Sequence, residues 1–109
     1  MGTMNYASST EPIELDDRLL AHVRTVALTK LRRGESFALT LPEHEKTSAT
    51  LWINASIPLR FDVSDEVALD RELLTAMMAE ASSSRGLDLT SPLLSAELSR
   101  GPRLRAMSA

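Results

Sequence analysis

Between residues 16 and 34, hydrophobic side chains recur at steps of three and four positions, the spacing that places them on one side of an α-helix. This apolar stripe consists of Leu19, Leu20, Val23, Val26, Ala27 and Leu31. Asp16 or Asp17 is suited to cap the start of the helix, and Gly34 to end it in a left-handed conformation. The pattern predicts a solvent side formed by Arg18, His22, Thr25, Thr29, Arg32 and Arg33. Lys30 lies nearer to the stripe, and its ammonium is expected to extend out to solvent.

Strands are expected where apolar and polar residues alternate. Short ones are predicted at residues 5–7, 12–15, 35–41 and 87–90. A polar connection over residues 42–48 leads to a longer alternating stretch over residues 49–63. Pro58 has no N–H to donate to a strand ladder. The second half of this stretch is therefore predicted to be an edge strand, or to be separated from the first half by a bulge or bend near residues 55–56.

A second amphipathic helix is predicted from another apolar stripe, formed by Leu73, Leu74, Met77, Met78 and Ala81. Asp70 is the expected N-cap, and the run "SSSRG" is expected to stop the helix, with Gly86 as the residue that follows its C-terminus.

The predicted order is strand, strand, helix, three strands, helix, strand. Because the strands do not alternate with the helices, this order favours an α+β fold. We expect a mostly antiparallel sheet of about five to six short strands, with the two amphipathic helices on one face. Residues 1–90 are predicted to form a single domain, and residues 91–109 a flexible basic tail.

Charge and composition narrow the classes of function. The chain carries a net charge of −3. The tail contributes +2, because Arg100, Arg103 and Arg105 face only Glu97, so the remainder carries −5. Such an acidic body is not attracted to nucleic acid by its overall field, and any such contact must be local. The chain has no stretch that could span a bilayer and no secretory signal, so we expect a cytoplasmic protein without membrane contact.

Candidate catalytic and metal sites are sparse. There is no cysteine, no glycine-rich phosphate loop, no nucleophile elbow and no pair of histidines at metal-binding spacing. His44 lies between two glutamates in a stretch that is typical of a solvated loop. We therefore expect no enzyme activity, no cofactor and no metal.

The basic side of the first predicted helix has two interpretations. Arg18, His22, Arg32 and Arg33, together with Arg100, Arg103 and Arg105 of the tail, could contact nucleic acid or phosphate. The alternative is structural, because cations near a helix C-terminus are stabilised by about 0.3–1 kcal/mol each. No aromatic residue is interleaved with the basic residues of that helix for a base to stack on, which favours the structural interpretation.

Trp52 is the principal candidate for a contact with a partner. If Leu51 and Ile53 face the core, Trp52 points away from it and could serve as an interface anchor, with Arg60 and Tyr6 as neighbours. The alternatives are that it packs under the N-terminal strand beside Tyr6, stacks on an arginine, or is turned inward by a bulge.

The segments "IELDDRLLAHVRTVALTKLRRGESF", "SATLWINASIPLRFDV" and "LDRELLTAMMAEASSSRGLDL" resemble a family of short actinobacterial proteins of uncharacterised function. The resemblance covers about residues 4 to 90. Members of this family often carry the automatic name "ATP-dependent DNA ligase", which would imply an adenylated lysine within a Lys-x-Asp-Gly signature. Lys30 is followed by "LRR" and Lys46 by "TSA", so neither matches. The resemblance implies a fold and an intracellular bacterial setting, with no catalytic residue.

Together these observations predict a small non-enzymatic module for interaction with a protein partner or for self-association as a homo-oligomer. The alternative is an accessory protein that contacts nucleic acid or phosphate through the basic helix end and the tail.

Overall fold

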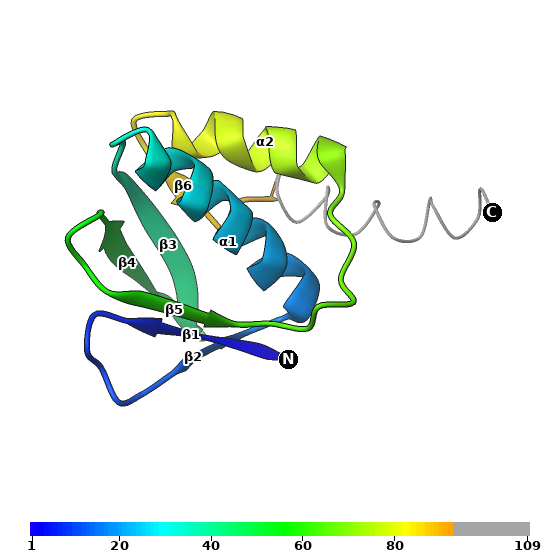
Figure 1. The fold of residues 1–109 in the computed structure, drawn as a ribbon. Helices are drawn as coiled ribbons and strands as arrows, with labels where there is room; N and C mark the ends of the chain where they lie inside the picture. Colours follow the sequence, from blue (N-terminus) through cyan, green and yellow to red (C-terminus); the bar gives the residue numbers. More distant parts are fainter. Residues whose placement is uncertain (93–109) are drawn as a thin grey trace.

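A computed structural model describes residues 1–92, apart from the side chain of His44, and contains two helices and six strands (Figure 1). The helices are α1 (Asp17–Arg32) and α2 (Arg71–Ala81). The strands are β1 (Gly2–Tyr6), β2 (Ile13–Leu15), β3 (Phe37–His44), β4 (Thr47–Ile53), β5 (Leu59–Asp62) and β6 (Leu87–Asp88). The α+β class and the order of elements are confirmed. The predicted tail lies outside the described residues from residue 93 onward.

The strands form two three-stranded sheets, with the orders β2-β1-β5 and β4-β3-β6, where we expected a single sheet. Every pairing is antiparallel except that of β6 with β3. The division follows from the break between Ile53 and Leu59, which sends β4 and β5 to different sheets. Pro58 immediately precedes β5, which is an edge strand as predicted.

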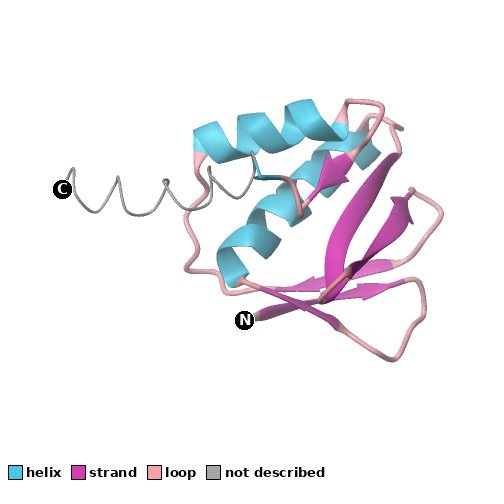
Figure 2. Cartoon of the chain, turned by 180° about the vertical axis from the view of Figure 1, so that it is seen from behind, coloured by secondary structure: helices cyan, strands magenta, loops and turns pink. Residues whose placement is uncertain are grey.

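Both helices lie on the same side of the β4-β3-β6 sheet (Figure 1). Seen from behind, the short strand β6 of this sheet lies in front of α1 (Figure 2). The alternation within β3 matches this arrangement, because Phe37, Leu39 and Leu41 are buried towards the helices while Ala38 and Thr40 lie on the opposite, outer face. The core also includes Met4 from β1, Val23 and Val26 from α1, and Leu73 and Met77 from α2.

The helices run in the same direction at an inclination to each other (Figure 1), and hydrogen bonds of the same sequence separation connect them at both ends. Near their N-termini, Arg18 Nη2 donates to Asp70 Oδ2 at 3.0 Å, a separation of 52 residues. Near their C-termini, Lys30 Nζ donates to Ser82 Oγ at 3.1 Å, again 52 residues apart. The two connections are therefore about 18 Å apart along α1 and along α2.

The predicted start and end of α1 are confirmed. The Asp16 carboxylate accepts hydrogen bonds from the backbone N–H groups of Arg18 and Leu19, and Gly34 follows the helix with a φ of 73°. Asp70 caps α2 in the same way.

The run "SSSRG" ends α2 as predicted, but the placement of Gly86 directly after the C-terminus of the helix is wrong. The helix ends at Ala81 with Ser82 as its C-cap, and Gly86 lies in the turn that leads to β6. Gly86 has a φ of 76°, and a Cβ at this position would lie 2.4 Å from the carbonyl oxygen of Ala38. Glycine is therefore required there by the close approach of the turn to β3, and not by the end of the helix.

The polar connection predicted over residues 42–48 is mostly strand. β3 continues to His44 and β4 begins at Thr47, so only Glu45 and Lys46 form the turn. An irregularity between Pro42 and His44 shifts the register. β6 pairs with β3 only at Leu39 and Thr40, so within residues 1–92 Pro42 lies where β3 has no strand on that side.

Candidate functional site

Trp52 lies on the outer face of the β4-β3-β6 sheet and is 55% exposed, as the alternation of β4 predicts. Its register partner on β3 is Ala38, and the next pair on this face is Thr40 with Thr50, whose hydroxyls are 3.0 Å apart. The indole therefore stands above neighbours with small side chains. A large, half-exposed aromatic residue in such surroundings is typical of a contact surface.

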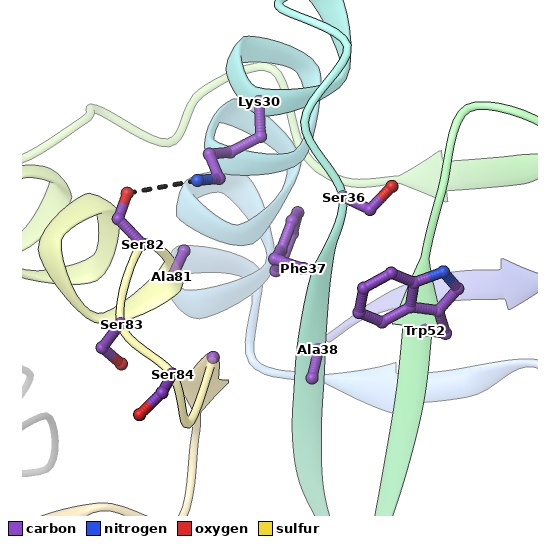
Figure 3. Close-up of a pocket in the computed structure, with 10 residues that line it drawn as sticks. Lys30, Ser36, Phe37, Ala38, Trp52, Ala81, Ser82, Ser83 and Ser84 are labelled. Atoms are coloured by element: carbon purple, nitrogen blue, oxygen red, sulfur yellow. Dashed lines mark hydrogen bonds between the residues drawn. The ribbon is translucent and has the colours of Figure 1, made fainter.

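The indole forms one wall of a pocket of about 250 Å³ (Figure 3). The pocket is lined by parts of α1, β3, β4 and the segment that follows α2, namely Lys30, Ser36, Phe37, Ala38, Trp52, Ala81, Ser82, Ser83, Ser84 and Gly86. Figure 3 shows Trp52 and the Ser82–Ser84 segment on opposite sides of β3, with Ala38 between them.

Lys30 is the charged residue of this lining, and only 5% of its surface is exposed. Its ammonium donates to Ser82 Oγ and lies 3.0 Å from Glu35 Oε1. The prediction that this ammonium extends to solvent is therefore wrong, because the C-terminal end of α2 covers it. A buried ammonium requires such partners, since an unpaired charge in the interior is costly.

Tyr6 and Trp52 are brought together, whereas Arg60 lies elsewhere. The Tyr6 hydroxyl donates to the backbone carbonyl of Trp52 at 2.8 Å and so connects the two sheets. Arg60 lies on β5 in the other sheet, where its guanidinium pairs with Asp62 at 3.0 Å.

The basic side predicted for α1 is divided between interior and surface. Its two N-terminal members are both covered. His22 is completely buried, and Arg18 forms a largely buried ion pair with Asp70. Their predicted solvent placement is wrong because α2 covers this side of α1. Thr25 and Thr29 are half-buried, and their hydroxyls donate to the carbonyls of Ala21 and Thr25.

The C-terminal end of α1 is different. Arg32 and Arg33 are exposed, and neither has an ion pair or a side-chain hydrogen bond within residues 1–92. Arg85 in the turn after α2 is likewise exposed and has no such partner in this part of the chain. The three other arginines of the predicted basic surface, Arg100, Arg103 and Arg105, lie outside the described residues.

The importance of Lys30 and of Ser82–Ser84 was missed by sequence reasoning. The run "SSSRG" indicated only the end of a helix, and a single lysine near an apolar stripe is usually solvated at its tip. Their proximity depends on the parallel packing of α1 and α2, for which the sequence carries no local signal.

These features define a small α+β domain in which two parallel helices cover one face of a three-stranded sheet and the other face carries Trp52. Residues 1–92 match the family described as "Domain of unknown function (DUF7882)", and the chain belongs to that family. No curated protein and no solved structure matches the chain. Among the described residues, no helix has the length and apolar character needed to cross a membrane.

Proposed function

We propose that this domain is a non-enzymatic interaction module that associates with a second copy of itself or with a protein partner through β4 and Trp52. The observation that carries the proposal is the unprotected edge of β4. β4 pairs only with β3, so one side of it has no neighbouring strand within the described residues. Its sequence, "TSATLWI", contains no charge, no proline and no glycine.

The other sheet edges are protected. β5 carries Arg60 and Asp62 and follows Pro58, β2 is three residues long with a central glutamate, and β6 consists of two residues. Charge, proline and short length are the usual means by which an edge avoids pairing with another chain. β4 lacks all three. The segment from Thr47 to Leu51 pairs with no strand on this side within residues 1–92, while the carbonyl of Trp52 is already bound by Tyr6.

A second copy that added its own β4 in antiparallel orientation would join two three-stranded sheets into one of six strands. The contact would be isologous, as in most homodimers. Trp52 immediately follows the free segment and lies on the exposed face, where its indole can pack across the junction.

Light scattering coupled to size exclusion tests the proposal. We expect wild-type chain to form a dimer whose population rises with concentration, and Ser48→Lys, which adds a charge to the exposed edge, to remain monomeric. Trp52→Ala should weaken association. The matched control is Leu28→Ala, because Leu28 is 49% exposed but lies on α1. A wild-type chain that stays monomeric and captures the same proteins as Trp52→Ala would contradict the proposal.

A second candidate function is contact with nucleic acid or phosphate through the basic end of α1. The observation in its favour is that Trp52 and Lys30 line the same pocket. Trp52 thus supplies, near the end of α1, the aromatic ring that the helix itself lacks. Arg32 and Arg33 would bind phosphate, together with the tail. Anisotropy with labelled oligonucleotides at low salt should then show binding that weakens in Arg32→Ala/Arg33→Ala. Binding that is absent, or unaltered in that variant, would exclude this function.

A further inference from the structure

The pocket between Trp52 and the Ser82–Ser84 segment combines hydrogen-bonding groups with an aromatic wall. Among the described residues its lining contains one ammonium, four serine hydroxyls and one indole, and the remaining members are Phe37, Ala38, Ala81 and Gly86. A concave site with a few convergent polar groups beside an aromatic ring is the usual form of a small-molecule site.

Several of these polar groups retain hydrogen-bonding capacity. An ammonium has three donors, and that of Lys30 makes one hydrogen bond to Ser82 and one ion pair with Glu35. Ser82 Oγ accepts from Lys30, so its own hydroxyl hydrogen can be donated to another group. The Ser84 hydroxyl makes no hydrogen bond within residues 1–92. Lys30, Ser82 and Ser84 therefore each keep a donor that the described structure does not use.

The balance of charge indicates the class of ligand. The positive charge of Lys30 is opposed by Glu35 at 3.0 Å. The C-termini of α1 and α2 also meet here, and each contributes about half a negative charge. These negative contributions offset the charge of Lys30, so the ammonium in the lining is already compensated. Helix N-termini are the ends that bind phosphate.

The indole indicates the second property of the ligand. The face of an aromatic ring carries the negative part of its quadrupole, so it attracts C–H groups that are polarised by neighbouring oxygens. A sugar ring presents such C–H groups on its face and hydroxyls around its edge. The pocket volume of about 250 Å³ is below the roughly 300–1,000 Å³ of sites for drug-sized ligands and suits a single ring.

We propose that this pocket binds a neutral sugar residue, stacked on Trp52 and hydrogen-bonded by Lys30, Ser82 and Ser84. The inference goes beyond the proposed association through β4. Both use Trp52, but only the pocket uses Lys30 and the segment after α2. The unprotected edge of β4 plays no part in it.

The chain has a single tryptophan, so its fluorescence reports on the pocket directly. The probes are D-glucose, the β-1,4-linked glucose trisaccharide and inorganic phosphate, each titrated into the full chain at low and high salt. A saccharide should produce a saturable shift in emission that is unaffected by salt, and should move the indole N–H resonance in NMR spectra.

Variants locate the site. Ser84→Leu should abolish the response by filling the pocket from an exposed position, whereas Ser82→Ala should weaken apparent affinity about two- to tenfold, as expected for one lost hydrogen bond. Ser8→Leu is the matched control, because Ser8 is also exposed but lies in the turn between β1 and β2, and this variant should bind the saccharide with wild-type affinity.

The absence of a saturable response to either saccharide would overturn the proposal, as would an equal response in Ser84→Leu. Salt-sensitive binding of phosphate alone would also overturn it and would assign the pocket to anions. Measurement of the oligomeric state in the same samples tests the β4 proposal separately from sugar binding. A monomer that binds sugar supports the pocket alone. Because Trp52 belongs to both surfaces, a chain that dimerises is also titrated as Ser48→Lys, and a monomeric Ser48→Lys variant without a sugar response refutes the pocket alone.

Discussion

The Lys30 ammonium lies 3.1 Å from the hydroxyl oxygen of Ser82, where the C-termini of the two helices meet. The two residues are 52 positions apart in the chain. The contact places a cation among the last carbonyl groups of α1 and beside the C-cap of α2, the ends at which a positive charge is most stabilising. Lys30 thus serves the packing of the two helices and the lining of the pocket at once.

A double-mutant cycle should detect this contact. Ser82→Ala is expected to lower the free energy of unfolding by about 1–2 kcal/mol when Lys30 is present, because a buried ammonium loses a partner. In a Lys30→Met background the same change should cost less, since the apolar side chain needs no partner. Urea denaturation of the four proteins measures the difference. Equal effects of Ser82→Ala in both backgrounds would show that the contact contributes nothing.

Mutation at the N-terminal ends of the helices should lower the free energy of unfolding by more. Asp70 caps α2 and also pairs with Arg18, whereas Asp16 only caps α1 in the described structure. Asp16→Ala should therefore cost about 0.5–2 kcal/mol. Asp70→Ala should cost about 3 kcal/mol or more, because it also removes the carboxylate from a largely buried guanidinium. Thermal or urea unfolding compares the two variants, and a cost for Asp70→Ala no larger than for Asp16→Ala would contradict the role of the ion pair.

Stability should depend on pH through His22. Its Nε2 accepts a hydrogen bond from the Asp70 N–H at 2.8 Å, and its Nδ1 faces the carbonyl of Arg18 at 2.6 Å. This geometry requires the neutral ring with its proton on Nδ1, because a protonated ring would direct a second N–H at the Asp70 N–H. The side chains of Arg18 and Asp70, whose backbone groups contact the ring, form an ion pair with each other.

Protonation of His22 is therefore disfavoured in the folded state, whereas in the unfolded chain the ring takes up a proton near pH 6.5. The expected result is that the free energy of unfolding decreases as pH falls below about 7. In His22→Gln this part of the pH dependence should be lost, while His44→Gln, the change at the other histidine of the chain, should retain it. Unfolding curves recorded from pH 5 to pH 8 provide the test, and a wild-type profile that is flat over this range would contradict the assignment.

Two glycines offer a matched comparison of backbone strain and close packing. Gly34 and Gly86 have φ values of 73° and 76°, but a Cβ at Gly34 would meet nothing within 4 Å, whereas one at Gly86 would collide with Ala38. Gly34→Ala should cost about 1–2 kcal/mol from strain alone. Gly86→Ala should cost that amount plus roughly 1–3 kcal/mol of overpacking. Urea denaturation gives both values, and similar costs would mean that the turn moves away from β3 at little expense.

Most of the fold could be predicted because its signals are local. The caps at Asp16 and Asp70, the glycine after α1 and the alternation around Trp52 are each set by a few neighbouring residues. The burial of His22 could not be predicted in this way. A helical wheel identifies the most apolar side of α1, but it does not indicate that a second helix covers a polar side.

The site was predicted less completely than the fold. Trp52 was identified because alternation on β4 is a local pattern. The approach of Ser82–Ser84 to Lys30 depends on contacts across 52 residues and on the path of three intervening strands. The same is true of the division into two sheets, which Pro58 suggested only as a local break.

The equal separation of the Arg18–Asp70 and Lys30–Ser82 contacts restricts how related chains can change in length. One residue inserted inside either helix would rotate everything beyond it by about 100° and break one of the two contacts. Insertions in the loops between β4 and β5, or between β5 and α2, would leave both intact. Length variation within the family should therefore concentrate in those loops, while residues 18–30 and 70–82 keep a constant count.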